Sequence, residues 1–519
     1  MIEIIEREGR KWLRVTGDVP PVGVPDGDAQ LLPFTYRAAK LLRQSGIKDV
    51  PSFSATRYHW PGPFTPAHHQ VETTEFMLYP RRLWCLNGMR TGKTASSVWA
   101  VDILMRAKEI QRVLVLCPLS IVYETWVQGF FQLTPDIEVE AAVGSTKSAT
   151  GVIRSKPQVV VCNHDKVKYN YSDLTEYKPD LVIVDEASVF RSHTSERYKA
   201  LKALVNNLKP RLWALTATPA GDKPTNVYAM AKLINPKVLP ASFGAWQNKV
   251  CRRVTWTDNK GYEKQMFVPL PGWEDEVAAV LKPAIRFRTQ DCIDMPPVVM
   301  VFRHAAMGKK QRDTWKLLKN KGVLMLDDRS MTAANAGVKV VKLLQVSSGL
   351  VYDKKGQSIE VDASNKMHEL EAVLDEAEGK VIVFTPFRHV MEWVVKQLKK
   401  RGHAAEHLSR DHSLNHRTDV FARFQRGSEE ELKVLVMHPA IAKYGLTLTA
   451  ANTTVWWGPI FSSETFEQAN MRMQGPGDHA NGIVMLYSTE AEKTLYEKLQ
   501  DGSDVQSAIV DVYKREVAT

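Results

Sequence analysis

Short runs of apolar residues recur along the chain between stretches with a helical pattern. Each run is continuous, which is typical of parallel strands that helices cover on both faces, whereas a strand with one face in water alternates apolar and polar residues. Four runs lie before residue 220 and four after residue 380, so the pattern predicts an α/β protein with two parallel-sheet domains. The runs begin at residues 113, 159, 181, 212, 381, 434, 453 and 482.

The segments beside the two predicted sheets have different patterns. Residues 1–62 are rich in Pro and Gly around one helical stretch, which predicts a small N-terminal accessory element. Residues 236–365 contain segments broken by Pro and Gly and then a helical pattern from about 306 to 320, which predicts an inserted helical subdomain. The first sheet domain is then expected over residues 63–235 and the second over residues 366–519.

Composition narrows the class of protein. The 519 residues leave room for about three domains, and 69 Lys and Arg against 58 Asp and Glu give a net charge of +11, which favours a polyanionic partner such as nucleic acid. The five cysteines form no C-x-x-C pair, which argues against a zinc ribbon or a disulfide framework. The N-terminus is charged and no apolar run approaches the ~18 residues of a membrane span, so we expect a cytoplasmic protein without a membrane anchor.

The stretch LNGMRTGKTA contains half of a phosphate-binding loop. In such loops, glycines let backbone N–H groups surround phosphate oxygens, while the lysine and the hydroxyl that follow reach the terminal phosphates and magnesium. Gly92, Lys93 and Thr94 supply the second half of this pattern. Asn87 stands where the first glycine is expected, and the turn contains Arg90, a bulky cation.

Two adjacent carboxylates, Asp185 and Glu186, end the apolar run LVIVDEAS. At the end of a buried strand one carboxylate can hold Mg²⁺ while its neighbour orients and deprotonates a water molecule. Such a pair is common at solvated strand ends and is a weak signal alone. Here it follows the Gly-Lys-Thr loop by about 90 residues, with an apolar run before each. The combination predicts phosphoryl transfer.

Further segments in the same order resemble the superfamily-two helicases, and most closely the Swi/Snf-type DNA-dependent ATPases, phage-encoded members above all. They are LVIVDEAS, LTATP at 215–219, GLTLTAAN at 445–452 and ETFEQANMR at 464–472, with PFTPAHHQ before the loop and CPLSIVYETW after it. The resemblance covers roughly residues 58–490. It implies two RecA-like lobes that bind ATP and Mg²⁺ in their cleft and grip DNA across both.

The resemblance assigns the nucleotide site residue by residue. Gln70 would read adenine, and Thr91, Gly92 and Lys93 of the loop would bind phosphate. The hydroxyl of Thr94 and the carboxylate of Asp185 would hold Mg²⁺, and the carboxylate of Glu186 would activate water.

Four threonines are implied to connect the nucleotide to DNA. Thr216 and Thr218 would couple the nucleotide state to DNA, although they could instead only end a strand. Thr447 and Thr449 would contact DNA phosphate and so position DNA without reading its sequence. The alternative for this second pair is an ordinary loop between a strand and a helix.

The resemblance also implies that Gln468 and Arg472 are catalytic residues of the second lobe. The family's final motif has a second arginine three residues later, an arginine finger worth ~10³- to 10⁵-fold in rate, and here that position is Gly475. Three outcomes stay open. Arg90 could reach the terminal phosphate and replace the finger, another arginine of the second lobe could do so, or Arg90 points to solvent and hydrolysis is impaired.

A helical stretch after residue 306 has a basic stripe. Lys309, Arg312, Lys316 and Lys319 share one helix face, which is either a solvated face, the commoner case, or a surface beside DNA. The sequence as a whole predicts a monomeric, ATP-dependent motor that translocates along double-stranded DNA. The alternative is a hydrolysis-weakened module that binds DNA or a protein partner such as RNA polymerase.

Overall fold

The computed structural model divides into two compact units. Unit 1 comprises Met1–Ala220, Thr225–Trp246 and Gly272–Cys292, and unit 2 comprises Gly221–Pro224, Gln247–Pro271 and Ile293–Thr519. The residues that the structure describes are 2–17, 23–221, 223–257, 263–294, 297–324, 333–352, 358–409, 411–442, 448–474 and 481–501.

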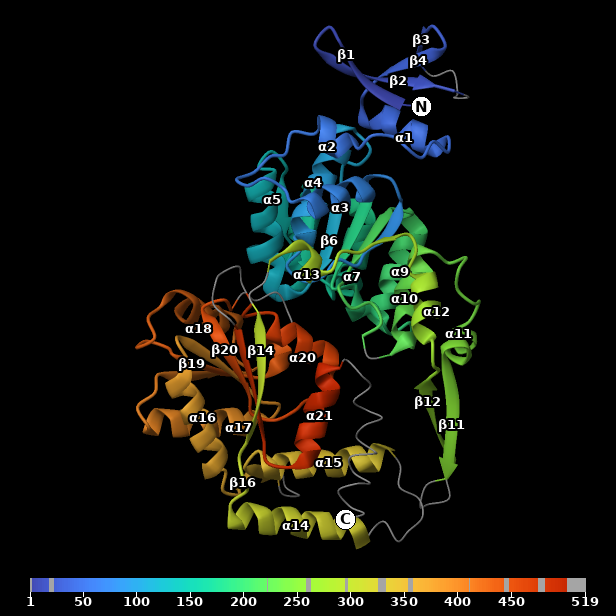
Figure 1. Cartoon of the computed structure of the whole chain (residues 1–519). Coiled ribbons are helices and arrows are strands. Elements are labelled where there is room, and N and C mark those ends of the chain that lie inside the picture. Colours follow the sequence, from blue (N-terminus) through green and yellow to red (C-terminus); the bar gives the residue numbers. More distant parts are fainter. Residues whose placement is uncertain are drawn as a thin grey trace. The chain divides into compact units, whose positions relative to one another are not determined.

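Unit 1 is built on a seven-stranded sheet in the order β13-β5-β10-β9-β6-β8-β7, in which the paired strands are parallel. Figure 1 shows helices on either side of this sheet. Because helices cover both faces, every residue of β6, β9 and β10 is buried. The strands are β5 (Arg82–Cys85), β6 (Val113–Cys117), β7 (Val139–Ala141), β8 (Val159–Asn163), β9 (Leu181–Asp185), β10 (Arg211–Leu215) and β13 (Ala284–Ile285).

Helices between these strands supply the rest of the unit 1 core. Three tryptophans, Trp99, Trp126 and Trp213, are fully buried in it. The helices are α3 (His68–Leu78), α4 (Lys93–Arg106), α5 (Gln128–Leu133), α6 (Thr146–Arg154), α7 (Lys166–Tyr169), α8 (Tyr171–Tyr177), α9 (Glu196–Leu208), α10 (Tyr228–Ile234), α12 (Trp273–Val280) and α13 (Thr289–Cys292), with α11 (Phe243–Val250) at its border. Short 3₁₀ or π turns are η1 (Leu119–Ile121), η2 (Val122–Val127), η3 (Ala187–Phe190) and η4 (Pro224–Val227).

The N-terminal element is a four-stranded antiparallel sheet with two helices. Its strands alternate buried and exposed positions, so that Leu13, Val15 and Leu32 pack against Ala39 and Leu42 of the first helix. This sheet and its helices lie within residues 1–62, the segment that the sequence predicts to be a small accessory element. Its elements are β1 (Ile2–Arg7), β2 (Arg10–Thr16), β3 (Val24–Asp26), β4 (Ala29–Pro33), α1 (Tyr36–Gln44) and α2 (Phe53–Arg57).

Unit 2 is built on a six-stranded parallel sheet in the order β14-β21-β20-β17-β19-β18. Its strands are β14 (Val298–His304), β17 (Lys380–Phe384), β18 (Ala405–Leu408), β19 (Val434–Met437), β20 (Ala451–Trp456) and β21 (Asn481–Tyr487). Its helices are α14 (Lys309–Leu324), α15 (Ala333–Ser347), α16 (Ser364–Glu376), α17 (Arg388–Lys400), α18 (Leu414–Arg426), α19 (Pro439–Ala442), α20 (Ser463–Asn470) and α21 (Glu490–Gln500). Two hairpins, β11 (Cys251–Thr257) with β12 (Glu263–Pro269) and β15 (Leu350–Tyr352) with β16 (Ser358–Glu360), complete it.

All eight apolar runs are strands of these two sheets, so the prediction of two parallel-sheet domains is confirmed. The segment predicted as an inserted helical subdomain, residues 236–365, contains α14 and α15 and also two strands that extend the sheets. β13 pairs with β5 in unit 1, and β14 pairs with β21 in unit 2. The domain boundaries remain predictions.

Candidate active site

Three neighbouring strands of unit 1 bring the glycine loop and the acidic pair to one edge of the sheet. β5, β10 and β9 lie side by side, and the register pairs Leu215 with Cys85 on one side and with Asp185 on the other. The glycine loop follows β5, Thr216 follows β10, and Glu186 follows β9. Adjacent strands lie about 4.8 Å apart, so the loop and the acidic pair start roughly 10 Å apart. Phosphate groups with a bound metal ion can bridge this distance.

The glycine loop ends at the N-terminus of helix α4. Gly92, the N-cap residue, has a φ of +77°, which glycine adopts without strain. A Cβ at this position would lie 2.2 Å from Nε2 of Gln70, so a larger residue would force a shift. No side chain caps the first turn of α4. Its N–H groups are therefore arranged to bind phosphate, as at other helix N-termini that bind anions.

The ammonium group of Lys93 lies against the backbone of the loop. Its Nζ donates to the carbonyl oxygen of Asn87 at 3.0 Å and to that of Gly88 at 2.8 Å. These two bonds use two of the three N–H donors of a lysine and fix the position of its charge. The donors of Lys93 and α4, with the oxygens of Thr94 and Asp185, fit a nucleotide phosphate chain and Mg²⁺.

Asn87, which replaces the first glycine of the loop pattern, connects the loop to a segment 200 residues away. Its Oδ1 accepts from the N–H of Phe287 at 3.0 Å, and its Nδ2 donates to Oγ1 of Thr73 at 2.8 Å. The hydroxyl of Thr289 donates to the carbonyl oxygen of Met89 at 2.8 Å. Side chains thus fix the shape of a loop that has fewer glycines than usual. Sequence reasoning identified only the lost glycine and missed these contacts.

The side chain of Gln70, on α3, contacts the glycine loop. Its Oε1 accepts from the N–H of Ala67 at 3.0 Å, and its Nε2 donates to the carbonyl oxygen of Thr91 at 3.4 Å. Nε2 of His69 lies 2.9 Å from the same carbonyl oxygen. To bind adenine, this side-chain amide would have to form a further hydrogen bond. The role of Gln70 remains a prediction.

Two N–H donors fix the carboxylate of Asp185. The indole Nε1 of Trp126 donates to Oδ2 at 2.9 Å, and the backbone N–H of Glu186 donates to Oδ1 at 3.0 Å. Trp126 is fully buried on η2, inside the segment CPLSIVYETW. Sequence reasoning noted this segment but assigned no role to its tryptophan. The indole orients the carboxylate that is predicted to hold Mg²⁺.

His164, which directly follows β8, supports the same strand end, although β6 lies between β8 and β9 in the sheet. Its Nε2 lies 2.7 Å from the carbonyl oxygen of Asp185. Burial lowers the pKa of His164 to about 4, so the ring is neutral near pH 7 and donates from Nε2–H to this carbonyl. Burial also raises the pKa of the Cys85 thiol to about 11, so the strand beside the site contributes no thiolate.

The residues after the acidic pair and after β10 have distinct local geometry. Glu186 has a φ of +51°, a left-handed conformation that is uncommon outside glycine and that concentrates at functional sites. Thr216 is buried between the loop and the acidic pair; its N–H donates to the carbonyl oxygen of Cys85 at 3.1 Å, and its Oγ1 accepts from the N–H of Thr218 at 3.2 Å. The coupling role of the two threonines remains a prediction.

In unit 2, the predicted catalytic residues lie on α20 and just after it. Gln468 is buried, and its Nε2 donates to Oε1 of Glu464 at 3.2 Å. Nε of Arg472 donates to the carbonyl oxygen of Ala442 at 2.8 Å, and the carbonyl oxygen of Arg472 accepts from the N–H of Leu448 at 3.0 Å. The end of α20 therefore contacts the start of the segment predicted to touch DNA.

Thr449 is the one residue of the predicted DNA-contacting pair that falls within the described ranges. It is exposed, and its Oγ1 accepts from Nε2 of Gln425 at 2.9 Å. Thr447 and Gly475 lie outside the described residues, so neither is placed by the structure.

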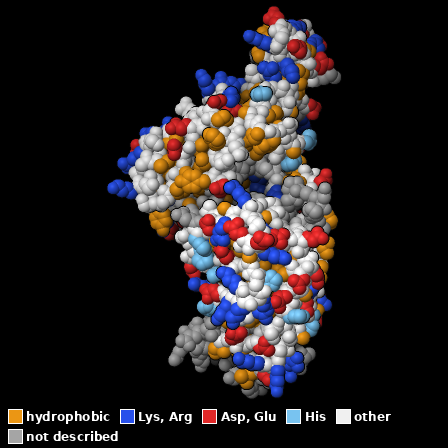
Figure 2. Space-filling model, turned by 90° about the vertical axis from the view of Figure 1, so that its left-hand side faces the viewer, with side chains coloured by type: hydrophobic (Ala, Val, Ile, Leu, Met, Phe, Trp, Pro, Cys, Tyr) orange, Lys and Arg blue, Asp and Glu red, His pale blue; other side chains and the backbone are white. Residues whose placement is uncertain are grey.

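The basic stripe on α14 is partly described. Lys309, Arg312 and Lys316 are exposed, whereas the side chain of Lys319 lies outside the described residues. On the face shown in Figure 2, Lys and Arg are interspersed with Asp and Glu, so this face presents no continuous basic surface. Both explanations of the stripe stay open. Within the described ranges, no helix combines the length and the apolar composition that crossing a membrane requires.

Two family models match the chain. Residues 84–350 match the SNF2-related domain, and residues 365–474 match the helicase conserved C-terminal domain. The first match contains the glycine loop, the acidic pair and Thr216, and the second contains Gln468 and Arg472. Both sets of predicted catalytic residues therefore lie inside matched regions.

Individual proteins are similar over different shares of the chain. Putative protein p41 of Acyrthosiphon pisum secondary endosymbiont phage 1 is 23% identical over 466 residues, which cover 86% of this chain and 98% of that protein. The ATP-dependent helicase FUN30 of Saccharomyces cerevisiae is 26% identical over 239 residues, which cover 43% of this chain and 20% of that protein. The Sulfolobus solfataricus SWI2/SNF2 ATPase core in complex with dsDNA is 18% identical, with 88% of this chain and 95% of that chain covered and a TM-score of 0.40.

Proposed function

Because the chain belongs to the SNF2-related family, with a helicase conserved C-terminal domain after the SNF2-related one, we propose that it is a DNA-dependent ATPase that moves along double-stranded DNA. The observation that supports this proposal most strongly is the in-register row of Cys85, Leu215 and Asp185. This row brings a phosphate-binding loop and an acidic pair to one sheet edge, with a threonine between them. A site of this kind serves phosphoryl transfer by positioning and charge stabilisation.

Each residue of the unit 1 site has a defined task in this proposal. The N–H groups of α4 and the ammonium of Lys93 bind the phosphates, while the hydroxyl of Thr94 and the carboxylate of Asp185 hold Mg²⁺. Bound Mg²⁺ supplies positive charge to the phosphate oxygens. Glu186 accepts a proton from the attacking water, and Trp126 keeps Asp185 oriented through its hydrogen bond at 2.9 Å.

Unit 2 completes the proposed cycle. Gln468 and Arg472 act on the nucleotide from this unit, and nucleotide binding and release alternate the two units between closed and open arrangements. Thr216 and Thr218 in unit 1 and Thr449 in unit 2 transmit the nucleotide state to DNA phosphates. We propose that the protein acts as a monomer. We also propose that it acts in the cytoplasm of a host cell, and the similarity to a phage protein supports this location.

One observation favours a second candidate function, a module that binds DNA or a protein while hydrolysing ATP weakly. Arg90 has a φ of +63° inside the phosphate-binding loop, a conformation that costs a non-glycine residue energy. If Arg90 replaces the missing finger, Arg90→Gly abolishes turnover and Gly475→Arg adds little. If Arg90 only obstructs the loop, Arg90→Gly improves nucleotide binding and Gly475→Arg raises turnover. The double variant measures the coupling between the two positions.

Phosphate release from Mg-ATP, measured with and without double-stranded DNA, tests the proposed function. The wild-type chain is expected to release phosphate faster with DNA. Glu186→Gln keeps the size of the side chain but removes the base, so turnover should fall about 100-fold or more while ATP and DNA binding persist. DNA-independent turnover, or turnover that survives in Glu186→Gln, would contradict the assignment.

A further inference from the structure

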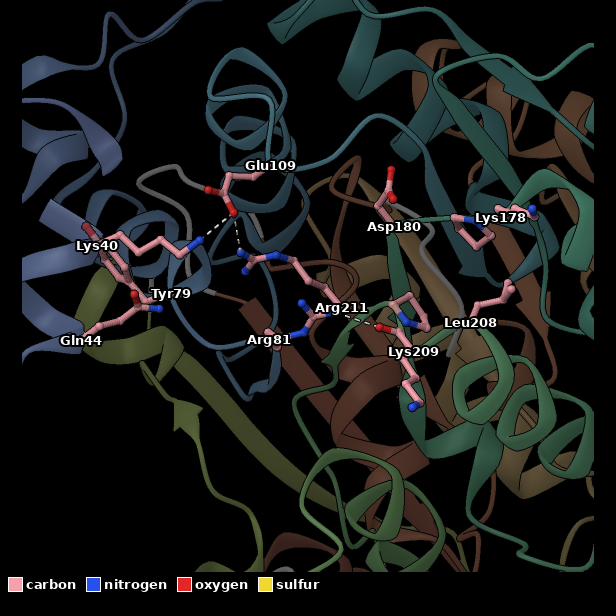
Figure 3. Close-up of a pocket in the computed structure, with 12 residues that line it drawn as sticks. Lys40, Gln44, Tyr79, Arg81, Glu109, Lys178, Asp180, Leu208, Lys209 and Arg211 are labelled. Carbon is pink, nitrogen blue, oxygen red and sulfur yellow. Dashed lines mark hydrogen bonds and ion pairs between the residues drawn. The ribbon is translucent and has the colours of Figure 1, made fainter. Parts of the chain in front are cut away.

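A polar cavity lies at the edge of the unit 1 sheet opposite to the glycine loop. It has a volume of about 430 Å³ and is lined by residues of α1, of the ends of α8 and α9, and of the chain just before β5, β9 and β10 (Figure 3). Because the strands are parallel, these are the amino ends of the strands whose carboxyl ends form the candidate active site. The proposed ATPase cycle assigns no role to this edge.

The same turn precedes two neighbouring strands at this edge. Helix α8 is followed by Lys178 and Pro179 before β9, and helix α9 by Lys209 and Pro210 before β10. Arg211 pairs with Leu181 in the register of these parallel strands. The strands lie about 4.8 Å apart, so the two Lys-Pro turns lie next to each other.

Both lysines are in a conformation that favours glycine. Lys178 has a φ of +54° and Lys209 a φ of +51°, and each precedes a proline, which restricts its backbone further. Glycine is the residue that ends helices in this way at least cost. The helix dipole favours a cation near the C-terminus of a helix. A lysine in the last helical turn would gain this favourable interaction without adopting a left-handed backbone conformation. The dipole therefore does not explain why a lysine occupies the left-handed position after both helices.

The two carboxylates of the cavity are already engaged. Glu109 pairs with Lys40 at 2.6 Å and with Arg211 at 3.5 Å, and both pairs are visible in Figure 3. The carboxylate of Asp180 accepts from the N–H groups of Gln111 and Arg112 at 2.8 and 3.0 Å.

Three further cations line the cavity: Arg81, Lys178 and Lys209. Within the described ranges, no ion pair joins any of the three to a carboxylate. The guanidinium of Arg81 donates to the carbonyl oxygen of Lys209 at 2.8 Å, which fixes the arginine beside the lysine. Three positively charged side chains therefore line one cavity without a carboxylate of their own.

The positive region continues into an adjoining cavity. This second cavity, also about 430 Å³, shares Arg81 and Lys209 with the first and adds Arg82 and Asn206 to its lining. Burial, together with the neighbouring charge of Arg81, lowers the pKa of Arg82. A bound anion would relieve this repulsion between like charges.

We propose that this edge of the sheet binds phosphate groups of an anionic ligand, through Arg81, Lys178 and Lys209. A phosphate offers more negative charge and more acceptor oxygens than a carboxylate, which matches a cavity lined by three cations without carboxylate partners. The planar fork of Arg81 suits two phosphate oxygens at once, while the lysines act as point charges. The phosphate belongs either to the backbone of DNA or to a free polyphosphate. An acidic protein segment is the competing ligand.

Glycine substitutions test this inference without risk to folding. In Lys178→Gly/Lys209→Gly both charges are lost, and glycine adopts the left-handed conformation without strain. Lys156→Gly is the matched control, because Lys156 also has a left-handed φ, +57°, but lines neither cavity. All proteins are full length and contain Lys93→Ala, so that the ammonium group of Lys93 in the glycine loop does not contribute to binding of the phosphate probes.

Three probes are then titrated: a short DNA duplex, inorganic tripolyphosphate and poly-glutamate. The double variant is expected to bind at least one phosphate probe about tenfold more weakly than the control. Loss of duplex affinity, with a slope of log K against log salt shallower by about 1.8, identifies DNA phosphate as the ligand. Loss of tripolyphosphate affinity alone identifies a free polyphosphate. Equal affinities in both proteins for both phosphate probes, or a loss confined to poly-glutamate, would overturn the inference. No outcome depends on ATP turnover, so the ATPase proposal is tested separately.

Discussion

Asp185 is held between a backbone N–H and the indole of Trp126, and this arrangement fixes the position of the carboxylate that is proposed to hold Mg²⁺. Such pre-organisation by a buried partner is a common way to orient a metal ligand. The tryptophan is on a π-helical segment between η1 and α5, and the exposed Tyr123 lies on the same segment. The segment thus has one side chain bonded to Asp185 and another at the surface.

Trp126→Phe should weaken Mg²⁺-dependent binding of ATP. The substitution retains an aromatic ring in the core but removes a hydrogen bond to a charged group, so the apparent affinity for Mg²⁺ should fall about tenfold. ATP binding without Mg²⁺ should change little. Titration of Mg²⁺ at fixed ATP measures the effect.

Trp99→Phe is the control for this variant, because Trp99 is also fully buried in unit 1 but donates to the carbonyl oxygen of Pro61. The Trp99→Phe variant should have the same apparent affinity for Mg²⁺ as the wild-type chain. An equal decrease in both variants would show that general loosening of the core, rather than the bond to Asp185, is responsible.

The buried ring of His164 makes the stability of unit 1 depend on pH. Its pKa is about 4 in the folded state, below the ordinary value of 6.5, because burial disfavours the charged ring. The unfolded chain therefore binds a proton first as the pH falls. The contribution is fully present above pH 6.5 and is lost progressively as the pH falls from 6.5 to about 4.

Unfolding of the wild-type chain and of His164→Gln, followed across this pH range, measures the contribution. The wild type should lose more stability than the variant by about 3 kcal/mol at the acid end, which corresponds to the change in pKa of the buried ring. Parallel pH profiles for the two proteins would contradict the assignment.

At the scale of secondary structure elements, a buried ion pair connects three helices of unit 2. Nζ of Lys366 on α16 lies 3.0 Å from Oε1 of Glu492 on α21, and both side chains are at most 1% exposed. The hydroxyl of Ser347 at the end of α15 donates to the same carboxylate oxygen at 2.8 Å. A buried pair of this kind contributes most clearly when one partner is removed, because the other charge is then left in the core.

Lys366→Met should lower the free energy of unfolding of unit 2 by about 3–5 kcal/mol. Arg401→Met is the matched control, since Arg401 pairs with Glu371 at 3.0 Å where the side chains are 34% and 27% exposed. Removing an exposed pair should cost about 0–1 kcal/mol. Denaturant unfolding of both variants gives the comparison, and similar losses in the two proteins would contradict the role of burial.

The elements that could be predicted from sequence are those with a strong local pattern. Continuous apolar runs identified eight strands, and the apolar run before the glycine loop marked the place of β5. Strand β18 was missed because its segment, AEHL, contains charged and polar residues. The roles of β13 and β14 depend on pairing with distant strands, which no local pattern contains. In the same way, the bond of Asn87 to Phe287 joins residues 200 positions apart.

The site was predictable where chemistry requires particular residue types at fixed spacing. Lys93, Asp185 and Glu186 were identified in this way, and the parallel register brings their strand ends together. Trp126 and His164 could not be assigned, because a tryptophan or a histidine in an apolar segment is most often a core residue. Their tasks depend on which strands become neighbours in the sheet.

Movement of the whole molecule along DNA requires both units to act on one nucleotide and on one DNA duplex. The family matches cover the predicted catalytic residues of both units. A motor of this kind converts ATP turnover into movement along DNA, whereas a binding module would hold DNA without moving. Turnover alone does not separate these two functions, but displacement of an obstacle does.

The most direct test is displacement of a third strand from a triplex formed on double-stranded DNA. The wild-type chain with Mg-ATP should displace the third strand without separating the strands of the duplex, because we propose movement along duplex DNA. Glu186→Gln should bind the same DNA and displace nothing, since it lacks the base that turnover requires. Wild-type protein that turns over ATP yet leaves the triplex intact, or that separates the duplex strands instead, would contradict the account.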